Sequence, residues 1–189
     1  MTRRVEGLLW ARVLAQRPAC IPVGRPRGIK REGVRYEETL ASGTFGSAKR
    51  GVWLEFADAN GHGYAQCDFL VAEGVCGALV PVVAEAKLTW RREAYGQLRG
   101  LYLPLLRAAL GRDVGALVVC ANLTPETPRA AIAGSLSEAL ARCARGEVPV
   151  LRVAAGASGR SPSKPGLRLA VARPKVPKWW GSKVPVLGV

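Results

Sequence analysis

Segments of alternating and continuous apolar character follow one another through the middle of the chain. Gly51–Asp58 and Tyr64–Ala72 alternate well enough to predict two strands. Residues 59–63 between them contain an Asn-Gly pair, the strongest short-range signal for a hairpin turn. Ala78–Thr89 begins apolar and becomes charged towards its end, which predicts a third strand. We therefore expect three strands in succession as antiparallel neighbours.

Helical spacing of apolar residues predicts two helices around these strands. Glu32–Ser42 is a short helix candidate before the first strand. Arg91–Leu110 is a longer candidate after the third strand, and Gly111 is a suitable residue to end it. Pro104 lies inside this second segment, so we expect it to kink the helix or divide it in two.

The last part of the pattern predicts a crossover arrangement. Val114–Ala121 is a continuous apolar run, as expected for a strand covered on both faces. Thr127–Arg145 is predicted to form another helix and Val148–Val153 a last short strand. The order is therefore α-β-β-β-α-β-α-β. This order indicates a mixed α/β (α+β) fold in which helices flank a central mixed sheet.

The two ends of the chain are more basic than its middle. Lys and Arg number 28 against 14 Asp and Glu, with a net charge of +7 over residues 1–50, −2 over residues 51–100 and +8 over residues 151–189. Residues 17–31 are rich in Pro, Gly and cations, and the segment after Ala154 contains no acid. We expect a basic N-terminal arm over residues 1–31, one domain over residues 32–153 and a basic C-terminal tail over residues 154–189.

Basic ends of this kind attract a polyanion and release its counterions. Nucleic acid is the favoured partner over an anionic membrane surface, because no amphipathic basic helix stands out. Aromatic residues make up 6% of the chain, which argues against a binding surface built mainly on stacking. The sequence leaves the oligomeric state open, a homo-oligomer included.

Localisation is predicted from segments that the sequence lacks. No apolar run approaches the length of about 18 residues that a transmembrane helix needs. Residues 1–13 do not form a secretory signal. The five cysteines include no CxxC pair, so zinc is not expected. We expect a cytoplasmic protein with reduced thiols.

Two carboxylates and a lysine fall where the second and third predicted strands run side by side. Side chains at i and i+2 of a strand share a face, so Glu85 and Lys87 project together while Ala86 points away. Asp68 lies on the neighbouring strand, and cross-strand Cβ atoms are about 4.5–5.5 Å apart. Hard divalent cations such as Mg²⁺ bind one or two carboxylates, waters and phosphate oxygens. Asp68 and Glu85 are therefore candidate metal ligands, and Lys87 is placed to orient water or to stabilise a charged transition state.

A competing interpretation makes Glu85 and Lys87 a surface ion pair on an edge strand and Asp68 a solvated residue. Both acids, however, lie inside apolar runs, CDFLV and VPVVAEA. A charge is costly there unless it has a use. The metal site is the favoured interpretation.

The Asp, a spacer and Glu-x-Lys at the end of an apolar strand resemble the PD-(D/E)xK nuclease superfamily. Asp68 stands at the first acidic position and Glu85-Ala86-Lys87 at the (D/E)xK motif, while Cys67 replaces the motif's Pro. The resemblance spans roughly Glu32–Val153. It implies a restriction-endonuclease-like core and phosphodiester hydrolysis that depends on Mg²⁺, with Mn²⁺ as a substitute. It also implies that the backbone carbonyl of Ala86 is a metal ligand.

The same resemblance points to residues on the two predicted helices. Members of the superfamily often place a Glu of the first helix at the metal site, and Glu37 is the candidate, with Glu38 as the alternative. RecB-like members carry Gln-x-x-x-Tyr on the helix after the lysine. Gln97 is retained as a catalytic-site candidate, but position 101 is Leu and the tyrosine follows at Tyr102.

Two other chemical roles are weighed and set aside. Some RecB-like nucleases hold an iron–sulfur cluster through one early and three late cysteines. Only Cys20, Cys120 and Cys143 could serve here, one too few, so no cluster is expected. His62 could act as a general base. Its place in a predicted turn favours simple exposure instead.

Basic and aromatic residues outside the catalytic group are candidates for DNA contacts. Arg suits bidentate phosphate binding, and cations beside stackable rings suit an unpaired strand. The candidates are Arg91 and Arg99 after the third strand, and Lys175, Lys178, Trp179, Trp180 and Lys183 in the tail.

These observations predict a divalent-metal-dependent DNA nuclease whose basic termini hold the substrate. One alternative is a non-catalytic nucleic-acid-binding protein on a nuclease scaffold. Within the enzymatic interpretation, a structure-specific resolvase of branched DNA, an exonuclease and an RNA-directed nuclease all remain open. A compact chain of this kind would suit a phage or mobile element and a role in DNA recombination or repair.

Overall fold

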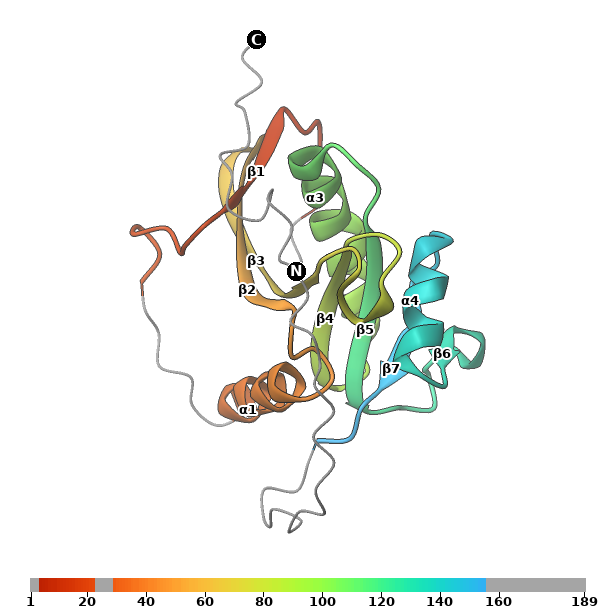
Figure 1. Ribbon diagram of the computed structural model, residues 1–189. Coiled ribbons are helices and arrows are strands. Elements are labelled where there is room, and N and C mark those ends of the chain that lie inside the picture. The colour runs from red at the N-terminus through yellow and green to blue at the C-terminus, as the bar shows by residue number, and fades with distance from the viewer. Residues whose placement is uncertain (1–3, 23–28, 156–189) are drawn as a thin grey trace.

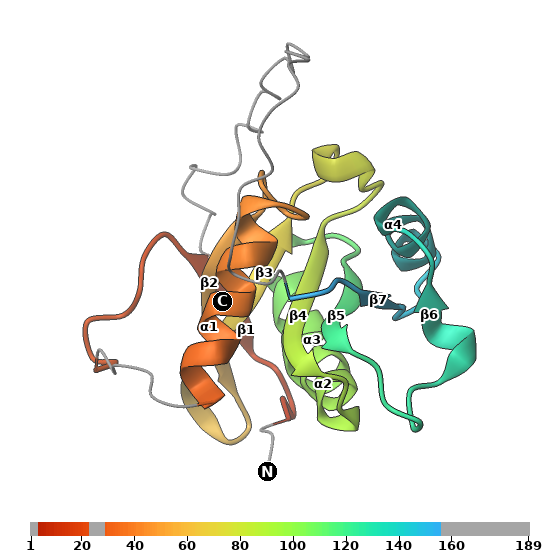
Figure 2. The ribbon, with the colours of Figure 1, turned by 90° about the horizontal axis from the view of Figure 1, so that it is seen from below.

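In the computed structural model, residues 4–22 and 29–155 are described. Within these ranges, seven strands form one mixed sheet in the order β1-β2-β3-β4-β5-β7-β6. Helices pack on the faces of this sheet (Figure 1 and Figure 2). The predicted mixed α/β architecture is confirmed. No helix in the described ranges is long and apolar enough to cross a membrane.

The antiparallel half of the sheet contains the first four strands. They are β1 (Trp10–Leu14), β2 (Lys49–Asp58), β3 (Gly61–Val71) and β4 (Val82–Thr89), and α1 (Ile29–Ser42) lies between β1 and β2 in the chain. The predicted hairpin joins β2 to β3, and its Asn60 N–H donates to Asp58 Oδ1 at 2.9 Å. The three predicted strands are therefore present as antiparallel neighbours.

The other half of the sheet is parallel. Its strands are β5 (Gly115–Asn122), β6 (Ile132–Ala133) and β7 (Val150–Arg152). The helical segments in this part of the chain are α2 (Arg92–Gln97), a π-helical turn (Leu98–Tyr102), α3 (Leu103–Leu110) and α4 (Leu136–Ala144). The short 3-10 turns are Val75–Gly77 and Arg129–Ala131. β5 lies between β4 and β7, parallel to both. Every residue of β5 except Asn122 is buried, which confirms the prediction of a strand covered on both faces.

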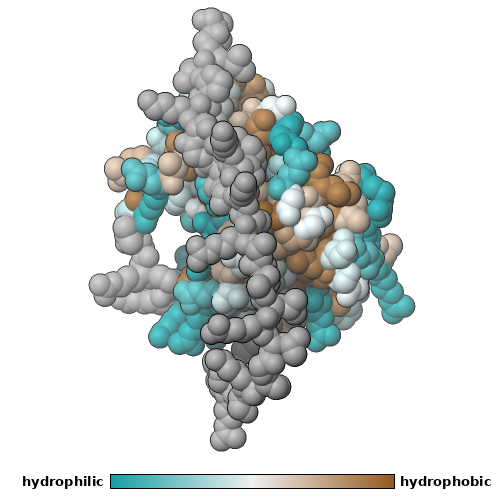
Figure 3. All heavy atoms as spheres, in the orientation of Figure 1, coloured by the Kyte–Doolittle hydropathy of each residue, from teal (hydrophilic) through white to brown (hydrophobic). Residues whose placement is uncertain are grey.

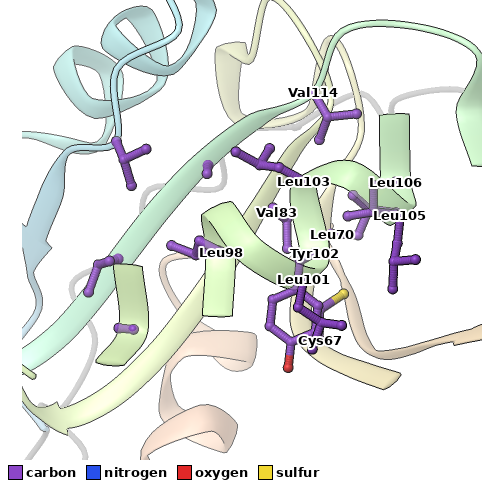
Figure 4. Packing of buried hydrophobic residues seen from close by; sticks show 14 of the residues in the cluster. Cys67, Leu70, Val83, Leu98, Leu101, Tyr102, Leu103, Leu105, Leu106 and Val114 are labelled. Atoms are coloured by element: carbon purple, nitrogen blue, oxygen red, sulfur yellow. The ribbon is translucent and has the colours of Figure 1, made fainter. Parts of the chain in front are cut away.

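One hydrophobic cluster lies on each face of the sheet. On one face, α3 and the π-helical turn pack against the strands through Leu98, Leu105 and Leu106, part of which Figure 4 shows. On the other face, α1 contributes Tyr36 and Leu40. Hydrophilic side chains cover the outer side of α1 at the lower left of the space-filling view (Figure 3), and its exposed residues include the charged Lys30, Arg31, Glu32, Arg35 and Glu38.

The prediction of an arm over residues 1–31 needs correction, because β1 belongs to the sheet. Trp10 pairs with Ala57 and Leu14 with Trp53, so β1 covers the free edge of β2. Five residues are too few for alternation to be distinctive, and tertiary pairing decides their conformation. The structure also begins α1 at Ile29, ahead of the predicted start at Glu32.

The prediction of one helix over Thr127–Arg145 is wrong for its first half. A 3-10 turn and β6 occupy that part, and α4 begins only at Leu136. Ser135 Oγ accepts a hydrogen bond from Glu138 N–H at 3.1 Å, and the Glu138 carboxylate accepts one from Gly134 N–H at 2.8 Å. This reciprocal capping fixes the start of α4, and the Ser-x-x-Glu spacing was its sequence signal.

Pro104 divides the segment 91–110, as predicted. An α-helix would pair the Gly100 carbonyl with the N–H of residue 104, which proline lacks. That carbonyl instead accepts from Val5 N–H at 2.9 Å, and the turn just before the proline is π-helical. The chain near the N-terminus therefore satisfies the backbone group that Pro104 leaves open.

The contact between β5 and α4 predicts a specific loss of stability. A Cβ atom at Gly115 would lie 2.7 Å from Cys143 Cβ and 3.1 Å from its carbonyl oxygen. We expect Gly115→Ala to lower the free energy of unfolding by about 1–3 kcal/mol in urea denaturation. Gly96→Ala, on α2 with nothing within 4 Å, is the control and should raise it by roughly 0.5–1 kcal/mol. Equal stability of the two variants would contradict this packing.

Candidate active site

The backbone pairing of the antiparallel strands β3 and β4 ends at Asp68. Their pairing covers Phe69–Val71 against Val82–Ala84. One step further, Asp68 Oδ2 accepts a hydrogen bond from Ala86 N–H at 2.8 Å, so a side chain takes the place of a backbone partner. We call this place, which is formed by Asp68 on β3 and by Glu85 and Ala86 on β4, the fork. The register sets Asp68 opposite Glu85, which brings both predicted carboxylates to it.

Glu85 carries its charge into the interior of the fork. Its side chain is 3% exposed, whereas that of Lys87 is 29% exposed. Lys87 Nζ donates to Glu85 Oε1 at 2.5 Å. Glu85 Oε2 is buried and has no hydrogen-bond partner among the described residues. A buried carboxylate oxygen without a partner is costly, and a bound cation or water would relieve that cost.

Burial raises the proton affinity of both carboxyl groups, and Asp68 adds to the shift at Glu85. Burial, and then the neighbouring Asp68, raise the pKa of Glu85 to about 7, although Lys87 opposes the shift. Burial also raises the pKa of Asp68, against the opposing effects of Ala86 N–H, Lys87 and Arg50. Two neighbouring acids with raised pKa values form a site at which a bound cation would stabilise their ionised forms.

A cleft of about 510 Å³ opens beside Asp68. Its lining residues are Val34, Glu37, Arg50, Gly51, Gln66 and Asp68. Of the two helix acids considered, Glu37 is the one that lines this cleft, and its side chain is 25% exposed against 59% for Glu38. Burial and the nearby Asp68 raise the pKa of Glu37, while Arg50 opposes the shift. The structure therefore places Glu37, rather than Glu38, next to Asp68.

Arg50 is a cleft residue that the sequence did not single out. Its guanidinium lies 3.3 Å from Glu37 Oε2 and 3.9 Å from Glu38 Oε1, and it donates to the Val34 carbonyl at 3.3 Å. It therefore ties α1 to β2 at the mouth of the cleft. Nothing in the sequence distinguishes it from the other arginines, because its partners come from another element.

Gly51 keeps the cleft open next to Arg50. It has φ +61, and a Cβ atom there would lie 2.8 Å from Gln66 Nε2. The position lies across from Asp68 in the β2–β3 register. A side chain at this position would be strained in its backbone and would crowd Gln66.

Gln97 and Tyr102 differ in how they are placed relative to Asp68 and Glu85. Gln97 is half-buried at the end of α2, and no described contact joins it to Asp68 or Glu85. Tyr102 is buried and its hydroxyl donates to the Gln66 carbonyl at 2.7 Å. Burial, and then Glu85 and Asp68, raise the pKa of Tyr102 well above its ordinary value. A π turn spans i to i+5, so it brings residue 102 back to the side of the helix that carries Gln97.

The remaining candidates lie away from the fork. Arg91 is exposed at the start of α2, and Arg99 is exposed with its guanidinium 5.9 Å from the centre of the Tyr95 ring. His62 Nε2 lies 2.9 Å from Glu55 Oε1, at the hairpin end of β3. The tail candidates Lys175, Lys178, Trp179, Trp180 and Lys183 lie outside the described residues.

The oxygen atoms at the fork suit a hard divalent cation. Within residues 4–22 and 29–155, no group of three or more His, Cys, Asp or Glu side chains is placed to hold a metal. Mg²⁺, however, needs only one or two carboxylates. N–H and C=O of a strand residue point to the same side, so the Ala86 carbonyl faces the fork as its N–H does. Asp68, Glu85 and this carbonyl form a fitting set.

Comparisons with known proteins give no further assignment. No protein-family model matches the chain, and neither a curated protein nor a solved structure matches it. The functional inference therefore rests on the geometry of the fork and the cleft.

The raised pKa of Glu85 predicts a pH-dependent stability. The folded protein holds a proton on this acid up to about pH 7, whereas the ordinary pKa of an exposed glutamic acid is 4.5. The contribution of Glu85 to the stability of the folded protein is therefore fully present below pH 4.5 and is lost as the pH rises through 7. We expect Glu85→Gln to increase the free energy of unfolding more at pH 8 than at pH 5, by a difference on the order of 1–3 kcal/mol.

Urea denaturation in EDTA at the two pH values measures this difference. Glu126→Gln, which changes an exposed acid in the loop after β5, is the matched control and should shift both values equally. A Glu85→Gln effect that is the same at pH 5 and pH 8 would show that Glu85 is not a strained buried acid.

Proposed function

We propose that this chain is a divalent-metal-dependent DNA nuclease of the PD-(D/E)xK superfamily, with a restriction-endonuclease-like core. The observation that carries the proposal is the fork. There Asp68 and Glu85 come together from two neighbouring strands, Lys87 donates to Glu85, and one Glu85 oxygen lacks a partner among the described residues. A purely structural ion pair would not need a second buried carboxylate beside it.

Each residue of the fork has a separate task in hydrolysis. Asp68, Glu85 and the Ala86 carbonyl would hold the ion. When bound, the ion supplies Lewis acidity and lowers the pKa of a coordinated water. Lys87 has N–H bonds beyond the one directed at Glu85. From its partly exposed position it can hold the attacking water or a phosphate oxygen.

The cleft supplies charge and position around this centre. Arg50 neutralises Glu37 and brings a guanidinium to the side of Asp68. Such a group binds phosphate oxygens through paired hydrogen bonds. Arg50 is therefore proposed to hold the phosphate next to the bond that is cut, with Glu37 fixing its orientation.

The charge of the chain supports a polyanionic substrate. The formal net charge is +14, and the excess is concentrated towards the two ends. Arg91, Arg99 and the cations of residues 175–183 remain the proposed contacts to the DNA backbone. A non-catalytic DNA-binding protein would share this charge. DNA binding alone would not require two neighbouring carboxyl groups with raised pKa values at the fork.

Cleavage assays with matched variants test the proposal. We expect the wild type to cut DNA with Mg²⁺ or Mn²⁺ and not in EDTA, on a panel of linear, nicked, single-stranded, supercoiled and four-way-junction substrates. Asp68→Asn, Glu85→Gln and Lys87→Met should each lower the rate by at least about 100-fold. Glu126→Gln is the control and should cut as the wild type does.

The variants also separate catalysis from binding. DNA affinity in EDTA should be kept in Asp68→Asn and Glu85→Gln, because these changes remove negative charge. A Lys87→Met protein that cuts at the wild-type rate would rule out the proposed chemistry. Binding without cleavage of every substrate would favour the non-catalytic alternative, and preferential cleavage of matched RNA would redirect the substrate assignment.

A further inference from the structure

A second functional surface continues from the cleft along β3. Side chains at alternate positions of a strand share a face, so Gln66, Tyr64 and His62 follow Asp68 towards the hairpin. Gln66 lines the cleft together with Asp68, which shows that the two surfaces are continuous. From Asp68 to His62 this line of side chains is roughly 20 Å long.

The neighbouring strands add aromatic and basic side chains to the same face. Trp53 pairs with Gln66, and Trp10 and His62 both pair with Ala57. Arg12 and Tyr64 both pair with Glu55. We call the set formed by Trp10, Arg12, Trp53, His62, Tyr64 and Gln66 the open face.

Several side chains of the open face are accessible. Trp10 is 42% exposed, and the side chains of Arg12 and His62 are 52% and 47% exposed. The hydrophobic cluster formed with α2 and α3 lies on the opposite side of these strands, through residues such as Val52, Leu54 and Phe56. In Figure 1, β1 and the β2–β3 hairpin rise away from α1, with α3 beside them. Aromatic rings on a solvent-facing sheet surface are available for a partner.

A buried acid holds the open face in a fixed arrangement. Glu55 is 8% exposed, and its carboxylate accepts from Arg12 Nε at 2.6 Å and from the Tyr64 hydroxyl at 3.1 Å. His62 Nε2 lies 2.9 Å from the same carboxylate, and its ring meets the Tyr64 ring edge-on at 4.9 Å. Three side chains are thereby positioned before any partner binds, which lowers the entropic cost of binding.

Cations accompany both tryptophans. The Arg12 guanidinium lies 5.9 Å from the centre of the Trp10 ring, and that of Arg17 lies 5.9 Å from the centre of the Trp53 ring. The acid on this face, Glu55, is already paired with Arg12. Rings for bases next to cations for phosphates are the combination that binds unpaired nucleic acid.

We infer that the open face binds a single-stranded segment of DNA and leads it to Asp68, which defines a substrate with an unpaired strand next to the cleavage position. The identification of that position rests on the proposed function, whereas binding to the face does not. In a duplex the flat sides of the bases are covered by their neighbours in the stack. Several rings fixed on the sheet can therefore stack along a strand only where its bases are unpaired.

Binding measurements in EDTA test the inference without any cleavage. Full-length wild type, Trp10→Ala and Trp53→Ala are titrated with a fluorescent single strand and with a hairpin duplex of the same composition. Each alanine variant should lose about 10-fold or more in single-strand affinity, with little change for the duplex. Trp10→Phe and Trp53→Phe, which keep a ring, should recover most of it. Leu79→Ala, a 65% exposed apolar side chain outside the open face, is the matched control and should bind as the wild type does.

The outcomes separate this inference from the nuclease proposal. Wild-type cleavage together with unchanged single-strand affinity in both tryptophan variants would overturn the open face as a binding site and leave the nuclease proposal standing. If single-strand binding depends on the two tryptophan rings but the protein cuts no substrate, the open face stands as a binding site and the nuclease proposal is overturned. Tighter, equally ring-dependent binding of RNA would overturn the DNA assignment. A loss of self-association without any change in DNA binding would identify a second copy of the chain as the occupant and overturn the inference.

Discussion

The site depends on one hydrogen bond, from Ala86 N–H to Asp68 Oδ2. It ends the pairing of β3 with β4 while keeping the two strands attached, so that a gap opens while the Ala86 N–H keeps a hydrogen-bond partner. The hydrophobic clusters on both faces hold the strands in place on either side of this gap. Glu85 and Lys87 can then reach the same small volume from β4. The acid that organises the fork is also a proposed ligand, so structure and chemistry share one residue.

Local sequence signals were sufficient for the centre of the molecule. Alternation and the Asn-Gly turn predicted the hairpin, and a short connection predicted β3 and β4 as neighbours. The i, i+2 rule then placed Glu85 and Lys87 on one face, as their contact confirms. The register itself, which sets Asp68 opposite Glu85, is known only from the structure. The metal-site prediction rested on the local signals and on the apolar surroundings of both acids.

Long-range partners decided what the sequence could not show. β1 forms because β2 has a free edge, and Arg50 is placed by Glu37 on a helix far away in the chain. The π turn before Pro104 changes the spacing of Gln97 and Tyr102, which no pattern of apolar residues encodes. Composition was misleading in another way, since an aromatic content of 6% does not exclude the concentration of Trp10, Trp53 and Tyr64 on one sheet face.

Divalent-ion binding at the fork is the central claim, and titration of the full-length protein with Mn²⁺ tests it most directly. Calorimetry at pH 8 should show Mn²⁺ binding to the wild type that is lost in Asp68→Asn and kept in Lys87→Met, since Lys87 is not a proposed ligand. Competition by Mg²⁺ at the same site is expected. Equal Mn²⁺ binding by the wild type and Asp68→Asn, or no binding by either, would contradict the assignment of the fork as a metal centre.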